Sequence, residues 1–196
     1  GLTPVNCDMD PDTLNIDTAK LACKITRRTG KNLRVDIARH PCDYSAMREI
    51  CKGKEIQIVS DSAHAFGSLY RGEAIPHWTD LSVFSFHATK DLTTGGGGAI
   101  LSRNGKLIER ARRLSRHGIT RDAWMRKQGR GWQYDIPEIW MKGNLQDILA
   151  SIGLGELTTF DQRQAKRRKI VERYAHNLRH MQDYLELPVE RPNCQS

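Results

Sequence analysis

The centre of the sequence contains four residues whose types and spacing fit chemistry at a lysine amine. They are Asp61, His64, Ser85 and Lys90. A lysine that forms covalent bonds must lose its proton, which burial or a neighbouring cation promotes. Lys90 follows a stretch, beginning at Ser85, that starts like a strand and is nearly uncharged. This setting is compatible with Lys90 acting as a covalent amine, although a lone lysine at a strand end is more often solvated.

Pyridoxal 5'-phosphate (PLP) is a cofactor whose needs match this set of side chains. Besides a lysine for its imine, PLP requires a carboxylate that keeps the pyridine nitrogen protonated, and donors for its phosphate. Asp61, at the end of a predicted strand, can supply the carboxylate, and Ser85 can bind the phosphate. Taken one at a time, these residues also fit commoner roles as a turn aspartate, a solvated lysine and a neutral hydroxyl at the edge of the core.

Short β-prone runs predict the strands that position these side chains. Asp61 directly follows one run, and the segment 87–90 follows another. Because ligands in open α/β sheets bind beyond the strand ends, both segments lie where this architecture favours a site. The predicted strands cover residues 33–38, 56–60, 81–86 and 99–102.

Helical patterns alternate with these strands, which indicates an α/β layer architecture with a mostly parallel sheet. Asp17 and Asp43 are predicted N-caps of two short helices, the first with an apolar face that extends to Ile25. Further helices are predicted over 107–114, from 147 onward, and from about 160 to 184, the last being ended by Pro188 and Pro192.

Two other segments between the predicted elements invite a functional interpretation. The glycines at 95–98 precede a strand and lack a following Lys-Ser/Thr, so they predict a tight turn with positive φ rather than a phosphate-binding loop. Residues 118–140 predict a long ordered loop. Its tryptophans fit either a sugar-binding or dimer surface or core anchors; they are Trp124, Trp132 and Trp140.

The overall composition limits the classes of partner. The 196 residues, 38% of them hydrophobic, suffice for one domain with a buried core. The formal charge of +8 favours contact with anions. Much of the excess lies at helical spacing in 110–116 and 163–179, where Tyr174 is the sole aromatic residue. This pattern indicates solvated helix faces and argues against nucleic-acid binding.

The cysteines and the lengths of the apolar runs indicate the cellular compartment of the protein. Five cysteines without a C-x-x-C pair predict reduced thiols in a cytoplasmic protein and no metal site. No apolar run approaches the roughly 20 residues of a membrane helix, and no leader opens the chain. Residues 1–5 enter a strand-like segment directly, as expected for a chain cut from a longer one.

Three segments together resemble one enzyme family. They are Asp61-Ser-Ala-His-Ala-Phe-Gly67, Phe84-Ser-Phe-His-Ala-Thr-Lys-Asp-Leu-Thr-Thr-Gly95 and Arg116-His-Gly-Ile119. They are similar to the core of the DegT/DnrJ/EryC1/StrS aminotransferases, which act on keto sugars attached to nucleotides. The similarity extends to 11–16 and 144–148, and so covers nearly the whole chain.

The resemblance implies a role for each matched residue. Lys90 would form the imine with PLP and move protons, Asp61 would pair with the pyridine nitrogen, and His64 would lie near the cofactor ring. Ser85 would bind the phosphate, and Asn144 would reach the phosphate in the neighbouring subunit, which implies a homodimer with a shared active site. A dehydratase branch of the family has histidine in place of this lysine, so Lys90 indicates transamination.

Some positions depart from the family's pattern. Asp36 and Arg39 stand where a histidine and a glycine are common, Gly96 replaces a usual glutamate, and Gly143 replaces a usual aromatic residue. Lys142 keeps a position that is often lysine. Family members also extend beyond both ends of this chain, and an earlier segment supplies further cofactor contacts. The resemblance therefore implies about half of a cofactor site here.

The expectation that follows is an aspartate aminotransferase-like, fold type I PLP-dependent transferase, truncated at both ends. Residues 1–158 would form part of the PLP-binding large domain, and 159–196 the linking helix and the start of the small domain. The amino group would pass from an amino acid, glutamate by family analogy, to a nucleotide-linked keto sugar in amino-sugar, cell-surface polysaccharide or antibiotic biosynthesis. The alternatives are a non-catalytic regulatory or interaction module and a basic domain that binds anions or nucleic acid.

Overall fold

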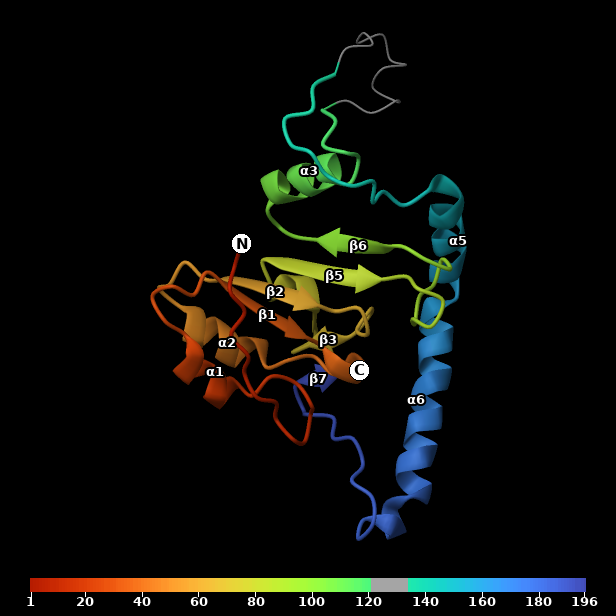
Figure 1. The fold of residues 1–196 in the computed structure, drawn as a ribbon. Helices are drawn as coiled ribbons and strands as arrows, with labels where there is room; N and C mark the ends of the chain where they lie inside the picture. Colours follow the sequence, from red (N-terminus) through yellow and green to blue (C-terminus); the bar gives the residue numbers. More distant parts are fainter. Residues whose placement is uncertain (121–133) are drawn as a thin grey trace.

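A computed structural model describes residues 1–120 and 134–196 of the chain. Its centre is a four-stranded sheet of β1 (Lys31–Val35), β2 (Gln57–Asp61), β5 (Leu81–Ser85) and β6 (Gly98–Leu101), in the order β1-β2-β5-β6. The first three strands are parallel, and β6 runs antiparallel to β5. The predicted α/β architecture with a mainly parallel sheet is confirmed (Figure 1).

Helices α1 (Thr18–Lys24) and α2 (Tyr44–Cys51) contribute to the core beside this sheet. Both predicted N-caps are present, because the Asp17 carboxylate accepts from the backbone N–H groups of residues 19 and 20 and that of Asp43 accepts from the N–H of residue 46. Ile25, expected on the first helix, is instead its extended C-cap. The core joins Leu21 of α1 to Met47 of α2 and Ile58 of β2.

The opposite face of the sheet is apolar but exposed. Register places Leu33, Val59 and Leu81 in one row across the strands, and Val83 beside Ile100. Leu33 is 67% exposed and Ile100 46%. Parallel sheets are ordinarily covered by polypeptide on both faces. In the described part of this chain, this apolar face of the sheet remains exposed.

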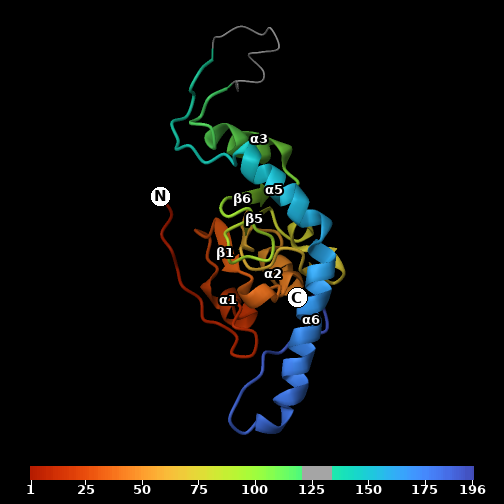
Figure 2. The same ribbon diagram turned by 90° about the vertical axis from the view of Figure 1, so that its right-hand side faces the viewer.

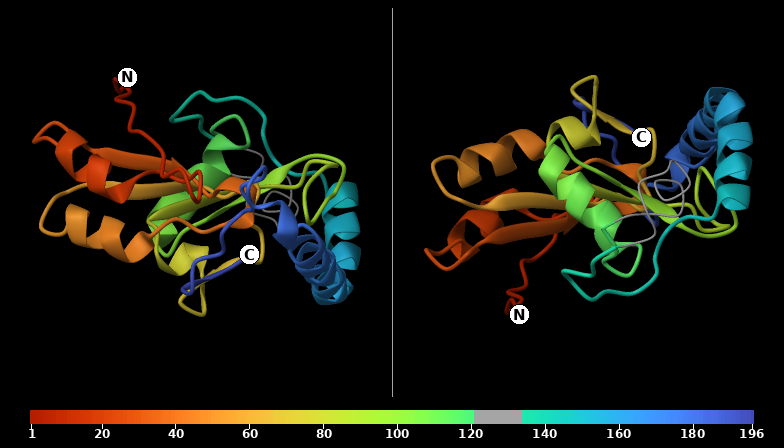
Figure 3. Two further views of the ribbon diagram at one scale, coloured as in Figure 1. Left: turned by 90° about the horizontal axis from the view of Figure 1, so that it is seen from below. Right: turned by 90° about the horizontal axis from the view of Figure 1, so that it is seen from above.

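The remaining helices lie away from α1 and α2. Helix α3 (Gly105–Leu114) follows β6 and lies beyond the β6 edge of the sheet, whereas α5 (Asp147–Thr158) and α6 (Phe160–Asn177) pass in front of the carboxyl ends of the parallel strands (Figure 2). Views from below and above show α1 and α2 toward the opposite end of the strands (Figure 3). The carboxyl ends of the parallel strands therefore face α5 and α6.

Two further predicted boundaries were wrong. The first strand ends at Val35 rather than at residue 38, because Ala38 and Arg39 have φ of 49° and 74° within a 3₁₀ turn, η1 (Ile37–Arg39). The last helix ends at Asn177, not near 184, and the chain turns through η3 (Arg179–Met181). The prolines at 188 and 192 thus lie well past the actual end of the helix.

A small antiparallel sheet was not anticipated from the sequence. It consists of β3 (Leu69–Tyr70), β4 (Glu73–Ala74) and β7 (Cys194–Gln195), in the order β4-β3-β7, and η2 (Ile75–His77) follows β4. Pairing of β3 with β7 brings the C-terminal segment back onto the core. Two-residue strands carry no readable alternation, which explains why they were missed.

Three properties of the chain as a whole can be stated for the described residues. All five cysteines are free thiols, and no described group of His, Cys, Asp and Glu side chains has the arrangement of a metal site. None of the described helices combines the length and apolar character needed to cross a bilayer. The predicted 118–140 loop lies partly outside the described residues. Trp124 and Trp132 fall in the part that is not described, and Trp140 is 57% exposed.

The docked C-terminal segment makes stability depend on pH through His40. This buried ring accepts from the Arg191 N–H through Nε2 (3.2 Å), and its Nδ1 lies 2.9 Å from the Pro41 carbonyl oxygen. Burial lowers the pKa of His40, although Glu190 and Asp36 favour the charged ring. A histidine whose pKa is lower in the folded state contributes stability above its unfolded pKa, and that stability is lost as pH falls.

We therefore expect the free energy of unfolding to decrease as pH falls below about 6.5. The His40 contribution to the slope cannot exceed about 1.4 kcal/mol per pH unit, the value for one proton. Urea unfolding between pH 7.5 and 5 measures it, with His40→Gln expected to flatten the curve and the exposed His64→Gln expected to leave it unchanged. Equal slopes for wild type and His40→Gln would contradict this assignment.

Candidate active site

Asp61 and Ser85 lie at the same edge of the main sheet. Asp61 is the last residue of β2 and Ser85 the last of β5, and the register pairs Val35 with Asp61 and Asp61 with Val83. Because side chains alternate along a strand, Asp61, Val83 and Ser85 point to the same face. The side chains of Asp61 and Ser85 are half-buried. The sheet therefore brings together the predicted carboxylate and hydroxyl.

A tight turn follows Asp61 and orients its carboxylate. The Ala63 N–H donates to Asp61 Oδ1 (3.1 Å), and the Ala65 N–H donates to the Ser62 carbonyl (2.9 Å). The Ser62 N–H in turn donates to the Val83 carbonyl (2.8 Å), which ties the turn to β5. His64, at the tip of the turn, is exposed. One carboxylate oxygen of Asp61 is thus held by the backbone, and His64 is presented outward.

Four phenylalanine rings pack this turn against β5 and α6. Phe66 makes edge-to-face contacts with Phe84, Phe86 and Phe160, with ring centroids 5.2 to 6.0 Å apart. Such pairs each contribute about 0.5–1.5 kcal/mol beyond their buried area. Gly67 has φ of 79°, and a Cβ there would lie 2.7 Å from the Phe160 ring. The aromatic cluster therefore fixes the Asp61 turn relative to the segment that leads to Lys90.

Lys90 lies on a loop, residues 86–97, that folds back on its own base. The Phe86 N–H donates to the Gly97 carbonyl (2.9 Å), and the Phe86 carbonyl accepts from the Thr94 N–H (3.0 Å). Gly95 and Gly97 have φ of 82° and 98°, which confirms the predicted glycine turn. Lys90 is half-buried, and its Nζ makes no hydrogen bond or ion pair with a residue of the described parts of the chain.

Asn144 lies apart from the other four residues in chemical environment. It is exposed, and its side-chain amide makes a long contact of 3.5 Å with the Leu145 carbonyl oxygen. Its neighbour Leu145 packs on the glycine turn, since a Cβ at Gly97 would lie 2.5 Å from Leu145 Cδ1. The Asn144 segment therefore borders the Lys90 loop while the Asn144 side chain remains available at the surface.

The set of donors at this edge fits PLP. An unpaired amine can form an imine with an aldehyde, a carboxylate with one oxygen held by backbone can pair with a protonated ring nitrogen, and the Ser85 hydroxyl can donate to a phosphate. The Ser85 oxygen already accepts from the His87 N–H (3.3 Å), which leaves its proton free to be donated. The chemistry of the donor set, rather than an enclosed cavity, carries this match.

Sequence reasoning missed an ionic cluster next to Lys90. The Asp91 carboxylate lies 3.0 Å from Arg39 Nη1 and 3.5 Å from Arg167 Nη1, so the loop is connected to η1 and to α6. The departure from the usual glycine at position 39 was the one signal in the sequence. It did not indicate which side chain Arg39 would meet, because that contact spans distant parts of the chain.

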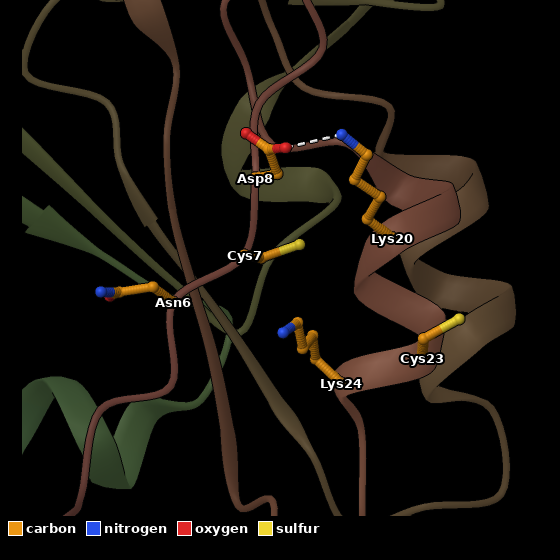
Figure 4. Close-up of a pocket in the computed structure, with 6 residues that line it drawn as sticks. All are labelled: Asn6, Cys7, Asp8, Lys20, Cys23 and Lys24. Carbon is orange, nitrogen blue, oxygen red and sulfur yellow. Dashed lines mark hydrogen bonds and ion pairs between the residues drawn. The ribbon is translucent and has the colours of Figure 1, made fainter.

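A shallow pocket elsewhere has no predicted site residue in its lining (Figure 4). It lies between the N-terminal segment and α1, where Lys20 Nζ forms an ion pair with the Asp8 carboxylate at 2.6 Å. The residues that line it are Asn6, Cys7, Asp8, Lys20, Cys23 and Lys24.

Comparison with known proteins gives concordant matches in sequence and in structure. The profile of the DegT/DnrJ/EryC1/StrS aminotransferase family matches residues 1–195. SpsC of Bacillus subtilis, a spore coat polysaccharide biosynthesis protein, is 36% identical over 89% of this chain and 45% of its own length. MJ1066 of Methanocaldococcus jannaschii is 34% identical over 96% of this chain and 49% of its own length. The chain thus spans about half the length of these curated relatives.

Among solved structures, the putative sugar aminotransferase Spr1654 from Streptococcus pneumoniae in its PMP form is 35% identical, with a TM-score of 0.81. The match covers 91% of this chain and 50% of Spr1654. The PLP form of the same protein gives a TM-score of 0.79. The α/β architecture is therefore that of the fold type I PLP-dependent aminotransferases. On the profile match and these identities, the chain belongs to the DegT/DnrJ/EryC1/StrS aminotransferase family.

Proposed function

We propose that the protein carrying this chain is a PLP-dependent aminotransferase that moves an amino group from an amino acid, glutamate by family analogy, to a nucleotide-linked keto sugar. The observation that carries the proposal is that the Lys90 amine, which has no partner among the described residues, lies on a loop anchored at the sheet edge that also presents Asp61 and Ser85. Bound PLP supplies an electron sink that makes the carbon bearing the amino group acidic.

Each proposed site residue then has a separate task. Lys90 Nζ would hold the cofactor covalently and, as a free amine, would carry the proton that moves during the reaction. Asp61 would keep the ring nitrogen protonated, Ser85 would donate a hydrogen bond to the phosphate, and the exposed His64 would contribute to the surroundings of the ring. The net charge of +8 suits a substrate that carries a diphosphate.

We also propose a homodimer in which Asn144 reaches the partner's cofactor phosphate. Support comes from α5, which has apolar residues on several sides yet leaves Ile148 74% and Leu154 68% exposed. A helix that is apolar all round is ordinarily buried. The remaining cofactor contacts, and cover for the exposed sheet face, would come from polypeptide outside this chain, in keeping with relatives about twice as long.

Two further assignments belong to the same proposal. Residues 1–158 would form part of the large PLP-binding domain, and 159–196 the link to the small domain; α6 begins at Phe160, directly after this boundary. A cytoplasmic location accords with free thiols at all five cysteines.

The amino-donor half of the reaction tests the proposal without knowledge of the sugar. With the purified protein as its host produces it, loaded with PLP, we expect glutamate to replace the visible absorbance of the imine by the near-ultraviolet band of the amine form. One 2-oxoglutarate should be released per site. A nucleotide-linked keto sugar should then restore the original spectrum. If no amino acid changes the spectrum of protein that has bound PLP, the proposed transamination is wrong.

A further inference from the structure

The residue that follows Lys90 is the centre of a partly buried ion-pair cluster. The side chain of Asp91 is 16% exposed and that of Arg39 is 18%, and their charged atoms lie 3.0 Å apart. Arg167 of α6 adds a second cation at 3.5 Å. Arg39 Nη1 also donates to Oε1 of buried Gln164, another residue of α6. The cluster therefore joins three elements: the Lys90 loop, η1 and α6.

These ion pairs connect the loop to other elements of the fold through side chains. In the described parts of the chain, the other side-chain hydrogen bonds of residues 86–97 stay within the loop or reach Ser85. The base of the loop is closed by the backbone bonds of Phe86. The two ion pairs of Asp91 hold its far end, one residue from Lys90. A shift of the Asp91 backbone would therefore displace Lys90.

Arg39 reaches Asp91 from an unfavourable backbone conformation. Its φ of 74° follows that of 49° at Ala38, and left-handed conformations strain residues that have a Cβ. Asn15 holds the turn, since its Oδ1 accepts from the Ile37 N–H and its Nδ2 donates to the His40 carbonyl. Glycine would adopt this backbone without strain, so the presence of arginine points to a use for its side chain.

We propose that Arg39 is a positioning residue for Lys90: through Asp91 it fixes the loop so that the amine keeps one place relative to Asp61. This inference rests on the proposed function, because it assigns Arg39 to the same site. Arg39 touches neither substrate nor cofactor in this scheme. A displacement of about 1 Å at a reacting group costs up to about a hundredfold in rate, so a loosened loop should lower kcat more than it changes KM.

The test compares Arg39→Gly, Asp91→Asn and Arg39→Lys with a matched control, Lys52→Gln. Lys52 pairs with Glu49, but both side chains are 73% exposed, so this control removes a cation from an ion pair far from the loop. Each variant is assayed for kcat and KM of the amino donor, for thermal unfolding, and for hydrogen exchange of residues 86–97. The protein is used as its host produces it, saturated with PLP.

Arg39→Gly is expected to lower kcat by about tenfold to a hundredfold while the midpoint of thermal unfolding stays within a few degrees of wild type, because the lost ion pair is offset by relief of the left-handed backbone. Asp91→Asn should also lower kcat and should speed hydrogen exchange in the loop. Arg39→Lys should lower kcat less than Arg39→Gly does, because lysine keeps a cation beside Asp91. Unchanged kcat in Arg39→Gly, or a kcat loss fully explained by unfolding, would overturn the positioning role.

Failure of this inference can be told apart from failure of the proposed function. Borohydride reduction of the wild-type protein with PLP is performed first, and the labelled peptide is identified. Label at Lys90 together with unaltered kinetics in the Arg39 and Asp91 variants would reject the positioning role alone. If Lys90 is not labelled in wild type, the proposed function fails, and with it the inference.

Discussion

Replacement of Lys90 by alanine is expected to abolish the covalent imine and to lower kcat by at least about 10²–10⁴-fold, the range that a positioned general acid–base group contributes. Because Lys90 Nζ has no partner among the described residues, its removal should cost little stability, and the loss of kcat can be assigned to the chemistry. The measurements are visible absorbance after addition of PLP, borohydride labelling and steady-state kinetics.

The control for this change is Lys106→Ala, which removes an exposed lysine in the first turn of α3. It should retain wild-type absorbance, labelling and rate. If the protein with alanine at position 90 still formed a reducible imine at one defined lysine and turned over at the wild-type rate, Lys90 would not be the cofactor-holding residue. The assignment of Asp61 and Ser85 would fall with it.

The same variant also tests the shared active site. A mixture of Lys90→Ala and Asn144→Ala subunits contains mixed dimers in which one site has both mutations and the other has neither. With random assortment, about a quarter of all sites regain the full set of residues. Each variant should therefore be impaired alone, and activity should rise when the two are unfolded and refolded together. No recovery in a verified mixed dimer would contradict the role proposed for Asn144.

Replacement of Asp36 by alanine is expected to destabilise the protein by about 3–5 kcal/mol, the usual cost of removing one member of a buried charged network. The Asp36 side chain is fully buried and accepts from the Tyr44 hydroxyl (2.7 Å), the Ser62 hydroxyl (2.6 Å) and the Cys42 N–H (3.0 Å). Burial, assisted by the Asp36 charge, raises the pKa of Tyr44 well above its usual range, so the phenol stays protonated and donates.

Because Ser62 adjoins Asp61, this network also supports the site. Urea unfolding at pH 7 measures the stability loss, and PLP affinity measured at a temperature where the variant remains folded shows whether the Asp61 turn has moved. Asp12→Ala removes an exposed carboxylate and serves as the control. A loss below about 1 kcal/mol for Asp36→Ala would show that the three donors find other acceptors.

Local signals in the sequence predicted much of the scaffold. Asp17 and Asp43 cap their helices as expected, since N-capping depends on residues within one turn of each other. The strands that end at Asp61 and Ser85 were found within one residue, because short runs of apolar, β-prone residues followed by polar residues mark them. The end of α6 was misplaced, because the prolines chosen as its stop lie beyond a helix that had already ended at Asn177.

The sequence by itself determined the chemical types present, namely a lysine, an aspartate and a serine in an order that resembles one family, and the strand ends that carry them. Only the tertiary structure decided which side chains meet. Parallel pairing placed Asp61 and Ser85 on one face, four phenylalanines joined the Asp61 turn to α6, and Arg39 crossed to Asp91 and α6. The physical reason is range: caps and strand patterns depend on neighbours a few residues apart, whereas an ion pair between residues 39 and 91 exists only after the β1–β2–β5 sheet has formed.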